Sequence, residues 1–479
     1  MGIDNFYTWI KAEYPSSVDD QMHKKRYDYI YVDANHILHS AITDSNNIKN
    51  FKEKIFFYLD CIFFNFIATK KIILAVDGSS PYSKVLLQRK RRLQYINKVN
   101  IDKLNSLHLT PGTQLMLQVE SFLYEYVDRL KLQYKILNTQ FIISPTTKHD
   151  EGELKIFKHL IQFGSNHSSS HLVIGNDADL VVLAMAVKPI YNIDLLIRHK
   201  NQRSIISIEK LLCLHYERIF KTRNLSIQNI NNNNFRDDFV ILSIMMGNDY
   251  IPKLNFVKFD NLWKSYISLI QLYQNYSLIN HNSFNIRILI NFFTIINTNL
   301  LPQFTKLSIY KYNPHKVINY LEGLLWCLNM YRYGSCPKYD FIYHFNSAPS
   351  PIDILFFLST NIFQISCPIS NTLPLDINAC PLLLIPKKAR CLIDDKYQSL
   401  IDNQLNDLYQ EEDCSECEIF KSKLANLNSL VKKSNKSDVD AIKIEISSIT
   451  NDFTVHKKSH NSFNIQDIKR VLQYVSCIK

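Results

Sequence analysis

The sequence predicts an α/β fold in which helices flank a central, mostly parallel β-sheet, together with a second region that is mostly helical. Three observations lead to this prediction. Short β-branched and aromatic runs alternate with longer apolar runs, as in βαβ units. Several of these runs end directly in acidic residues, where parallel sheets place their ligand crevices. The 479 residues are 46% hydrophobic, which suits a globular chain of two or three domains.

Five predicted elements deliver acidic residues to their ends. Four are strands and the fifth is an apolar helix that stops at Gly247, and in order they are Tyr29–Val32, Lys71–Val76, Gln140–Ser144, Leu172–Ile174 and Phe239–Met246. Helices are also predicted after the third strand, over Leu154–Leu160, and after the fourth, over Leu180–Val187. The acidic residues that follow these elements are Asp33, Asp77, Glu151, Glu153, Asp177, Asp179 and Asp249.

The carboxyl ends of parallel strands share one edge of a sheet, so we expect the seven carboxylates to converge on one crevice. Taken singly, each aspartate is better explained as an N-cap or a turn residue than as a metal ligand. Together, however, the acids would repel one another unless cations neutralise them. Oxygen ligands select Mg²⁺ or Mn²⁺, and two such ions can hydrolyse a phosphodiester.

Positive charge predicts a polyanionic partner. Lys and Arg number 55 against 44 Asp and Glu, a net charge of +11, which favours nucleic acid. Residues 79–101 contain six cations and no acid. If Ser83–Gln94 is a helix, one face carries Lys84, Gln88, Arg91 and Arg92. Two interpretations stay open at this point: a pocket for a terminal phosphate, and a solvated helix that contacts a nucleic-acid backbone.

No secretory signal or membrane-spanning run is evident, so we expect no membrane partner and a cytoplasmic location, with the nucleus as the alternative. The ten cysteines should therefore stay reduced. Cys414 and Cys417 have the spacing of a metal-ligand pair, but no second Cys or His pair follows at a zinc-knuckle distance. The acidic stretch around them favours a solvated segment over structural zinc.

These motifs resemble those of the Xrn-type 5′→3′ exoribonucleases, which share a metal-dependent core with flap endonucleases (PIN/flap-nuclease-like). The resemblance covers residues 1 to about 400, and its second block runs from Tyr320 to Pro349. The matching stretches in the first part are Met1–Ile3, Tyr31–His39, Ala75–Gly78, Lys84–Arg92, Thr110–Thr113, Glu151–Ile156, Asp177–Leu180 and Gly247–Pro252. The chain looks like a compact member that lacks the long C-terminal extensions.

The resemblance implies that the seven acids are metal ligands or support them. It also implies that Lys84, Gln88, Arg91 and Arg92 bind a 5′-monophosphate. His39 matches a histidine that stacks on the first base, with helix packing as the alternative. Phe341 stands near the place of a stacking Trp, and a core role for Phe341 is the alternative.

The implied function is hydrolysis of 5′-monophosphorylated single-stranded RNA to nucleoside 5′-monophosphates during RNA decay, with decapping or RNA-decay proteins as partners. Rival interpretations are a flap endonuclease on DNA and a non-catalytic RNA-binding scaffold. We expect a catalytic core over residues 1–260, a helical connector over 261–310, a second conserved region that packs on the core over 311–400, and a helical closing segment over 401–479.

The sequence departs from the family pattern in three places. Asp150 replaces the usual Gly before the first Glu, and Leu154 replaces the His after the second. Asp4-Asn5 stands where the family has Pro-Lys. The eighth carboxylate, on Asp150, could alter metal affinity.

Overall fold

The computed structural model describes residues 3, 5–21, 23–134, 139–164, 168–199, 202–220, 235–273, 277–304, 313–360, 364–431, 436–457 and 463–478. The chain forms two compact units, each built from two separate stretches. Unit 1 comprises Met1–Lys84 and Leu117–Leu375, and unit 2 comprises Val85–Met116 and Asp376–Lys479. The four-part division expected from the sequence stays a prediction.

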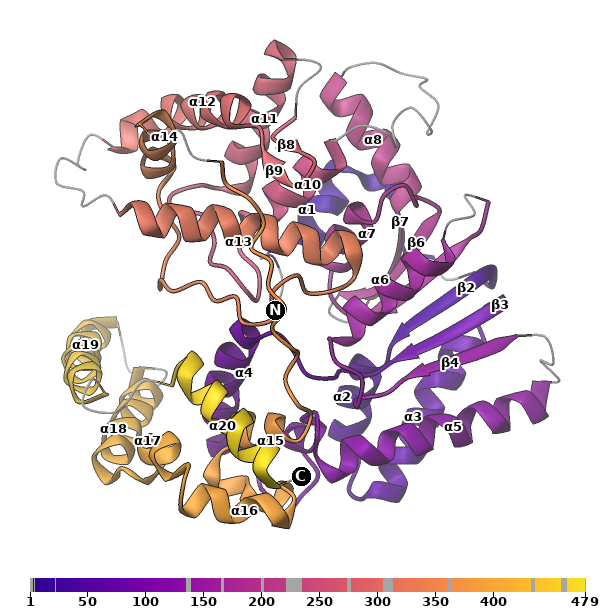
Figure 1. The fold of residues 1–479 in the computed structure, drawn as a ribbon, viewed down its shortest axis with the longest axis vertical. Helices are drawn as coiled ribbons and strands as arrows, with labels where there is room; N and C mark the ends of the chain where they lie inside the picture. Colours follow the sequence, from indigo (N-terminus) through magenta and orange to yellow (C-terminus); the bar gives the residue numbers. More distant parts are fainter. Residues whose placement is uncertain are drawn as a thin grey trace. The chain divides into compact units, whose positions relative to one another are not determined.

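Unit 1 contains a seven-stranded sheet with the strand order β1-β7-β6-β5-β2-β3-β4 (Figure 1). The five strands from β6 to β4 are parallel, whereas β7 is antiparallel to both β6 and β1. The strands are β1 Val18–Asp19, β2 Lys25–Asp33, β3 Phe66–Ala75, β4 Gln140–Ser144, β5 His171–Gly175, β6 Ile193–His199 and β7 Gln202–Ser207. The predicted α/β class, with a mostly parallel sheet, is confirmed.

The helices of unit 1 follow the strands along the chain and enclose the sheet. Helix α6 packs on β2 and β3, and α2 and α3 contact β3, with α6 and α3 on opposite sides of the sheet in Figure 1. The helices that begin in unit 1 or lie mainly within it are α1 Phe6–Glu13, α2 Ala34–Thr43, α3 Ile48–Phe63, α4 Tyr82–Tyr95, α5 Gln114–Tyr134, α6 Gly152–Phe163, α7 Leu180–Ala186, α8 Ile208–Phe220, α10 Phe235–Ile244, α11 Phe259–Leu272, α12 Ile286–Phe304, α13 Pro314–Tyr333 and α14 Pro351–Thr360. A two-stranded ribbon, β8 Ile279–Asn280 with β9 Ser283–Phe284, completes the unit.

The middle of the sheet is the core of unit 1. Every residue of β5 is buried, as are Ile30, Tyr31 and Val32 of β2 and every residue of α7. A parallel strand that is covered on both faces requires such a continuous apolar run. The polar residues that follow these runs are therefore confined to the strand ends, at one edge of the sheet.

Unit 2 consists of helices and surrounds a buried arginine. After α4, its helices are α15 Ala379–Leu384, α16 Asp395–Asp402, α17 Gln410–Asp413, α18 Ser415–Val431, α19 Lys436–Lys457 and α20 Ile465–Ile478. Arg89 of α4 is 4% exposed and donates to the carbonyl oxygens of Leu383 (2.8 Å) and Leu408 (2.6 Å). Its guanidinium also lies over the rings of Tyr409 and Phe463. This cation of the basic stretch therefore links α4 to the segments around Leu383 and Leu408.

In the part of the chain that the structure describes, no helix combines the length and the apolar character needed to cross a bilayer.

Candidate functional site

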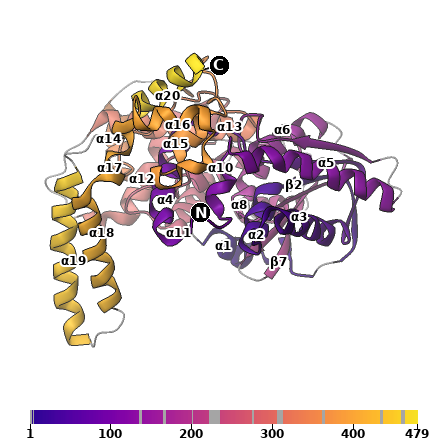
Figure 2. The same ribbon diagram turned by 90° about the horizontal axis from the view of Figure 1, so that it is seen from below.

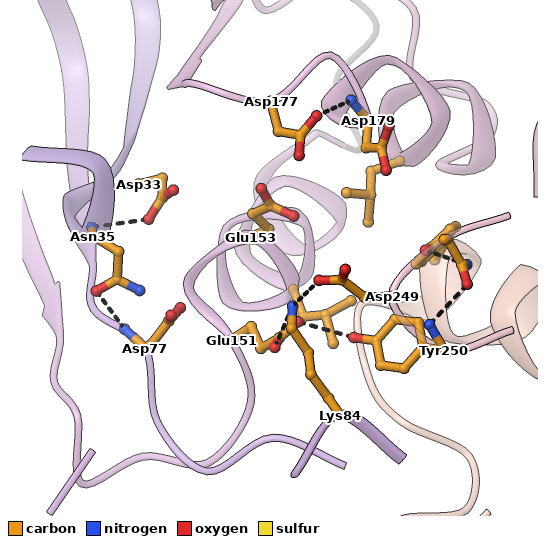
Figure 3. Close-up of a pocket in the computed structure, with 14 residues that line it drawn as sticks. Asp33, Asn35, Asp77, Lys84, Glu151, Glu153, Asp177, Asp179, Asp249 and Tyr250 are labelled. Atoms are coloured by element: carbon orange, nitrogen blue, oxygen red, sulfur yellow. Dashed lines mark hydrogen bonds and ion pairs between the residues drawn. The ribbon is translucent and has the colours of Figure 1, made fainter. Parts of the chain in front are cut away.

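One cavity of unit 1 collects all seven of the predicted acidic residues. It has a volume of about 130 Å³ and lies beyond the carboxyl ends of the parallel strands. Figure 3 shows the side chains around it. Its lining residues are Asp33, Asn35, Asp77, Lys84, Glu151, Glu153, Leu154, Asp177, Asp179, Leu183, Asn248, Asp249, Tyr250 and Tyr331. The structure thus brings together acids from five separate segments.

Asp33 is the last residue of β2, and Asp77 comes two residues after the end of the adjacent strand β3. Asp33 Oδ1 caps α2 by accepting from the backbone N–H of Asn35 (3.0 Å), and Asp77 Oδ1 accepts from the N–H of Gly152 (2.6 Å). A Cβ atom at position 152 would lie 3.0 Å from Asp33 Oδ1 and 3.3 Å from Asp77 Oδ1. Because only glycine leaves this space open, it lets the start of α6 approach both aspartates.

Glu151 and Asp249 share one cation. Lys84 Nζ lies 2.6 Å from Glu151 Oε1 and 3.1 Å from Asp249 Oδ2. The hydroxyl of Tyr250 donates to Glu151 Oε2 at 2.9 Å. Gly247, with φ of +92°, lies three residues after the end of α10, and Asn248 Oδ1 accepts from the backbone N–H groups of Tyr250 and Ile251. This turn presents Asp249 and Tyr250 to the cavity.

Asp177 and Asp179 lie in the turn between β5 and α7. Asp177 Oδ1 accepts from the N–H of Asp179 (3.2 Å), and Asp179 Oδ1 accepts from the N–H of Ile3 (2.9 Å). The buried Arg236 of α10 donates to the carbonyl oxygens of Ala184 and Met185 at the end of α7. These bonds satisfy carbonyls that a helix end leaves unpaired, so they fix α7 and the turn before it.

Burial and the charges of neighbouring acids raise the pKa values of Asp33, Glu153 and Asp179. Burial, with the Asp77 charge next in size, raises the pKa of Asp33 to about 8. Burial and then Asp177 raise the pKa of Asp179 to about 7. The pKa of Glu153 is raised well above its ordinary value by burial and by Asp33 and Asp177. Seven ionised carboxylates are therefore costly in this cavity without added positive charge.

Lys84 supplies part of that charge. Burial acts to lower the pKa of Lys84, but the charges of Glu151 and Asp249 outweigh it and raise the pKa above its ordinary value. The ammonium group therefore stays charged between the two acids.

The donor set of the cavity fits hard divalent cations. The charged groups that could bind a metal ion there are carboxylates, and neither Cys nor His is among the lining residues. Within the described ranges, no three of these carboxylates bring one oxygen each within 4.8 Å of one another. One ion would therefore meet at most two of them as arranged. Mg²⁺ commonly binds through one or two carboxylates and keeps several waters.

Asp150, the departure from the family pattern, is not a lining residue of the cavity. Its φ of +75° lies in the left-handed region, where glycine is favoured and aspartate is tolerated. Its side chain is buried and accepts from the hydroxyl of Tyr339 at 2.8 Å. The left-handed backbone conformation explains why glycine suits this position. The carboxylate of Asp150 is hydrogen-bonded to Tyr339 and is not a lining group of the acidic cavity.

The four residues predicted to bind a phosphate all lie on α4. Lys84, Gln88, Arg91 and Arg92 follow one another at helical spacing, and each is partly exposed. His39 lies on α2 with an exposed side chain. Phe341 is 4% exposed, and its ring stacks on that of Trp326 with 5.0 Å between centroids. This packing favours the core role that the sequence left open for Phe341.

Sequence reasoning missed several polar residues of the cavity. Asn35 Oδ1 accepts from the backbone N–H of Asp77 (3.3 Å), and Asn248 Nδ2 donates to the hydroxyl of Tyr331 (3.2 Å). Tyr250 adds the bond to Glu151 described above. Asn35, Asn248 and Tyr250 are each within two residues of a predicted acid in the sequence, and that adjacency was the signal available.

Comparison with known proteins gives one family and several relatives. Residues 1–197 match the family model described as the XRN 5′-3′ exonuclease N-terminus. A protein named 5′-3′ exoribonuclease 1 from Schizosaccharomyces pombe is 25% identical over 298 residues, which cover 53% of this chain and 22% of that protein. Its namesake from Saccharomyces cerevisiae is 25% identical over 296 residues, covering 53% of this chain and 19% of that protein. The chain thus spans about a fifth of the length of these relatives.

Solved structures give weaker matches. The catalytic core of Rad2 in complex with a DNA substrate aligns with a TM-score of 0.37 and 13% identity, covering 73% of this chain and 91% of that one. The T5 D15 protein co-crystallised with metal ions aligns with a TM-score of 0.28 and 12% identity, covering 58% of this chain and 91% of that one.

Proposed function

We propose, because residues 1–197 match the family model of the XRN 5′-3′ exonuclease N-terminus, that this chain is a metal-dependent 5′→3′ exoribonuclease. Its substrate would be single-stranded RNA with a 5′-monophosphate, and its products nucleoside 5′-monophosphates. The observation that carries the proposal is the meeting of seven carboxylates in one cavity, beside one ammonium that contacts two of them and carries a single positive charge.

The seven acids would hold two Mg²⁺ or Mn²⁺ ions, some as direct ligands and the others as supports of those ligands. Such ions would supply an activated water and stabilise the departing 3′-oxygen of the scissile phosphodiester. The chain's own groups keep the carboxylates in position. Lys84 and Tyr250 fix the two oxygens of Glu151, the Gly152 N–H fixes Asp77, and the Ile3 N–H fixes Asp179.

Residues of α4 would bind the leading, 5′ end of the RNA. A monophosphate offers several acceptor oxygens and up to two charges, which suits guanidinium and amide donors such as those of Gln88, Arg91 and Arg92. Lys84 would connect the two functions, because its ammonium already contacts the acidic cavity. The exposed ring of His39 would stack on the first base.

A role in mRNA decay follows as part of this proposal. Removal of a cap leaves a 5′-monophosphate, so decapping enzymes would supply the substrate. The cytoplasmic location expected from the sequence, with the nucleus as the alternative, stays a prediction.

The test compares one RNA sequence with three leading ends: monophosphate, triphosphate and cap. Each is labelled at its 3′ end and incubated with the purified chain in Mg²⁺, beside a single-stranded DNA and a flapped DNA duplex. We expect rapid decay of the monophosphorylated RNA alone. Equal decay of the three RNAs would contradict recognition of the leading end. Faster cleavage of the flapped duplex would instead favour a flap endonuclease.

A further inference from the structure

Two cysteines and a histidine meet within unit 2. Cys414 precedes α18, Cys417 lies in its first turn, and His456 lies near the end of α19. One ligand atom from each of the three residues lies within 4.8 Å of the other two. Among the residues that the structure describes, this is the one such group formed by His, Cys, Asp or Glu.

The spacing of these atoms is close to that of a zinc site. Zn–S distances of about 2.3 Å and Zn–N distances of about 2.0 Å place the ligand atoms of a tetrahedron roughly 3.5–3.8 Å apart. Cys414 Sγ lies 3.3 Å from His456 Nε2, and no pair of ligand atoms is more than 4.8 Å apart. Side-chain shifts of about an ångström would therefore complete the geometry.

The histidine is already oriented for metal binding. Its Nδ1 lies 2.9 Å from Glu416 Oε2, while its Nε2 faces the sulfur of Cys414. A proton on Nδ1 that is donated to the carboxylate leaves Nε2 unprotonated, with its lone pair available to a metal ion beside Cys414 Sγ. Carboxylate–histidine–zinc arrangements of this kind fix the tautomer of metal-ligating histidines.

The surroundings of the three residues are partly apolar. Cys417 is fully buried, and its backbone N–H donates to Cys414 Sγ at 3.5 Å. The ring of Phe420 stacks on that of Phe453, 5.3 Å between centroids, and lies 5.7 Å from the imidazole of His456. Helices α18 and α19 lie side by side along their length in Figure 2. The cluster sits at one end of this helical pair.

We propose that Cys414, Cys417 and His456 bind one Zn²⁺ ion, with water as the fourth ligand, and that the ion fastens the start of α18 to the end of α19. Thiolate and imidazole ligands select zinc over the hard cations that suit the acidic cavity. The sequence argued against zinc because no second Cys or His pair follows Cys417. The helical pair supplies a single histidine from the far end of a second helix, which local spacing does not reveal.

The test measures zinc in the full-length chain, purified under reducing conditions without chelator, supplied with one equivalent of ZnCl₂ and dialysed. Cys414→Ser, Cys417→Ser and His456→Ala remove one ligand each. Cys391→Ser alters an exposed cysteine of unit 2 that lies outside the cluster, and Asp179→Asn alters the acidic cavity. Replacing zinc with Co²⁺ adds a spectroscopic reading, since a thiolate-to-cobalt absorption band appears only if cysteine binds the ion.

We expect one zinc per chain, its loss in the three ligand variants, and its retention in Cys391→Ser and Asp179→Asn. Glu416→Gln should weaken zinc affinity by about 10- to 100-fold, because it removes the group that orients the histidine. Circular dichroism shows whether a variant that lacks zinc is still folded. Absence of zinc from the wild-type chain would overturn the proposal. So would zinc that persists in folded ligand variants, or a Cys414–Cys417 disulfide in the purified chain.

Discussion

Replacing Lys84 with Met tests whether its ammonium stabilises the fold against repulsion between the acids of the cavity. The substitution keeps most of the aliphatic chain and removes a charge 2.6 Å from Glu151 Oε1 and 3.1 Å from Asp249 Oδ2. The three side chains are 18%, 9% and 21% exposed, so water would hydrate the abandoned acids poorly. Removing one partner of a buried ion pair costs roughly 3–5 kcal/mol.

We expect Lys84→Met to lower the free energy of unfolding by about 3 kcal/mol in EDTA, at the low end of that range because none of the three side chains is fully buried. Urea denaturation followed by circular dichroism gives this quantity. Mg²⁺ should restore part of the loss, since a bound cation replaces the missing charge. Lys90→Met, on the exposed face of the same helix, is the matched control and should change stability by less than about 0.5 kcal/mol. A loss in Lys84→Met no larger than that of Lys90→Met would refute the reasoning.

Three further predictions concern recognition, positioning and pH. Arg91→Ala should reduce the preference for monophosphate over triphosphate ends, whereas Lys90→Ala should leave it unchanged; unchanged preference in both would remove Arg91 from the proposed pocket. Tyr250→Phe deletes the 2.9 Å bond to Glu151, and a hydrogen bond to a charged group is worth about 1.5–3 kcal/mol. If that bond acts in the transition state, kcat/KM falls about 10- to 100-fold, and an unchanged value would show that Glu151 does not depend on it. Burial, followed by the charge of Arg218, lowers the pKa of His215 to about 3. The unfolded chain therefore binds a proton at His215 below pH of about 6.5 that the folded chain excludes, and stability falls on acidification by about 2 kcal/mol between pH 7 and pH 5. Urea titrations at the two pH values should show a smaller loss in His215→Gln, and an equal loss would contradict the assignment.

The local pattern of apolar and polar residues was sufficient to predict the strands that carry the acids. The run Gln140–Ser144 forms β4 with the predicted bounds, and the apolar runs at Tyr29 and Leu172 lie in β2 and β5. A parallel strand that is buried on both faces is apolar along its length, and polar residues begin where it ends. The apolar run therefore locates the strand in the sequence and shows where it ends. That is why an expectation of seven converging carboxylates could be formed from the sequence.

Contacts between distant segments could not be predicted in the same way. Lys84 was expected to face a phosphate, but its ammonium lies between Glu151 and Asp249, and neither is near it in sequence. Likewise, Arg89 looks like another surface cation of the basic stretch, yet it is buried among carbonyls of a segment some three hundred residues later. The hairpin of β6 and β7 was also missed. Side-chain pairing across the fold depends on packing, which composition and periodicity do not encode.

The most direct test of the central claim measures nucleotide release from a 5′-monophosphorylated RNA in Mg²⁺ by the wild-type chain and by Asp179→Asn. Asparagine keeps the oxygen that accepts from the Ile3 N–H and removes the carboxylate charge from the cavity. We predict that the wild-type chain releases nucleoside 5′-monophosphates successively from the leading end, and that Asp179→Asn still binds the RNA but releases none. Release by Asp179→Asn at the wild-type rate would contradict the claim that the clustered carboxylates carry out the hydrolysis.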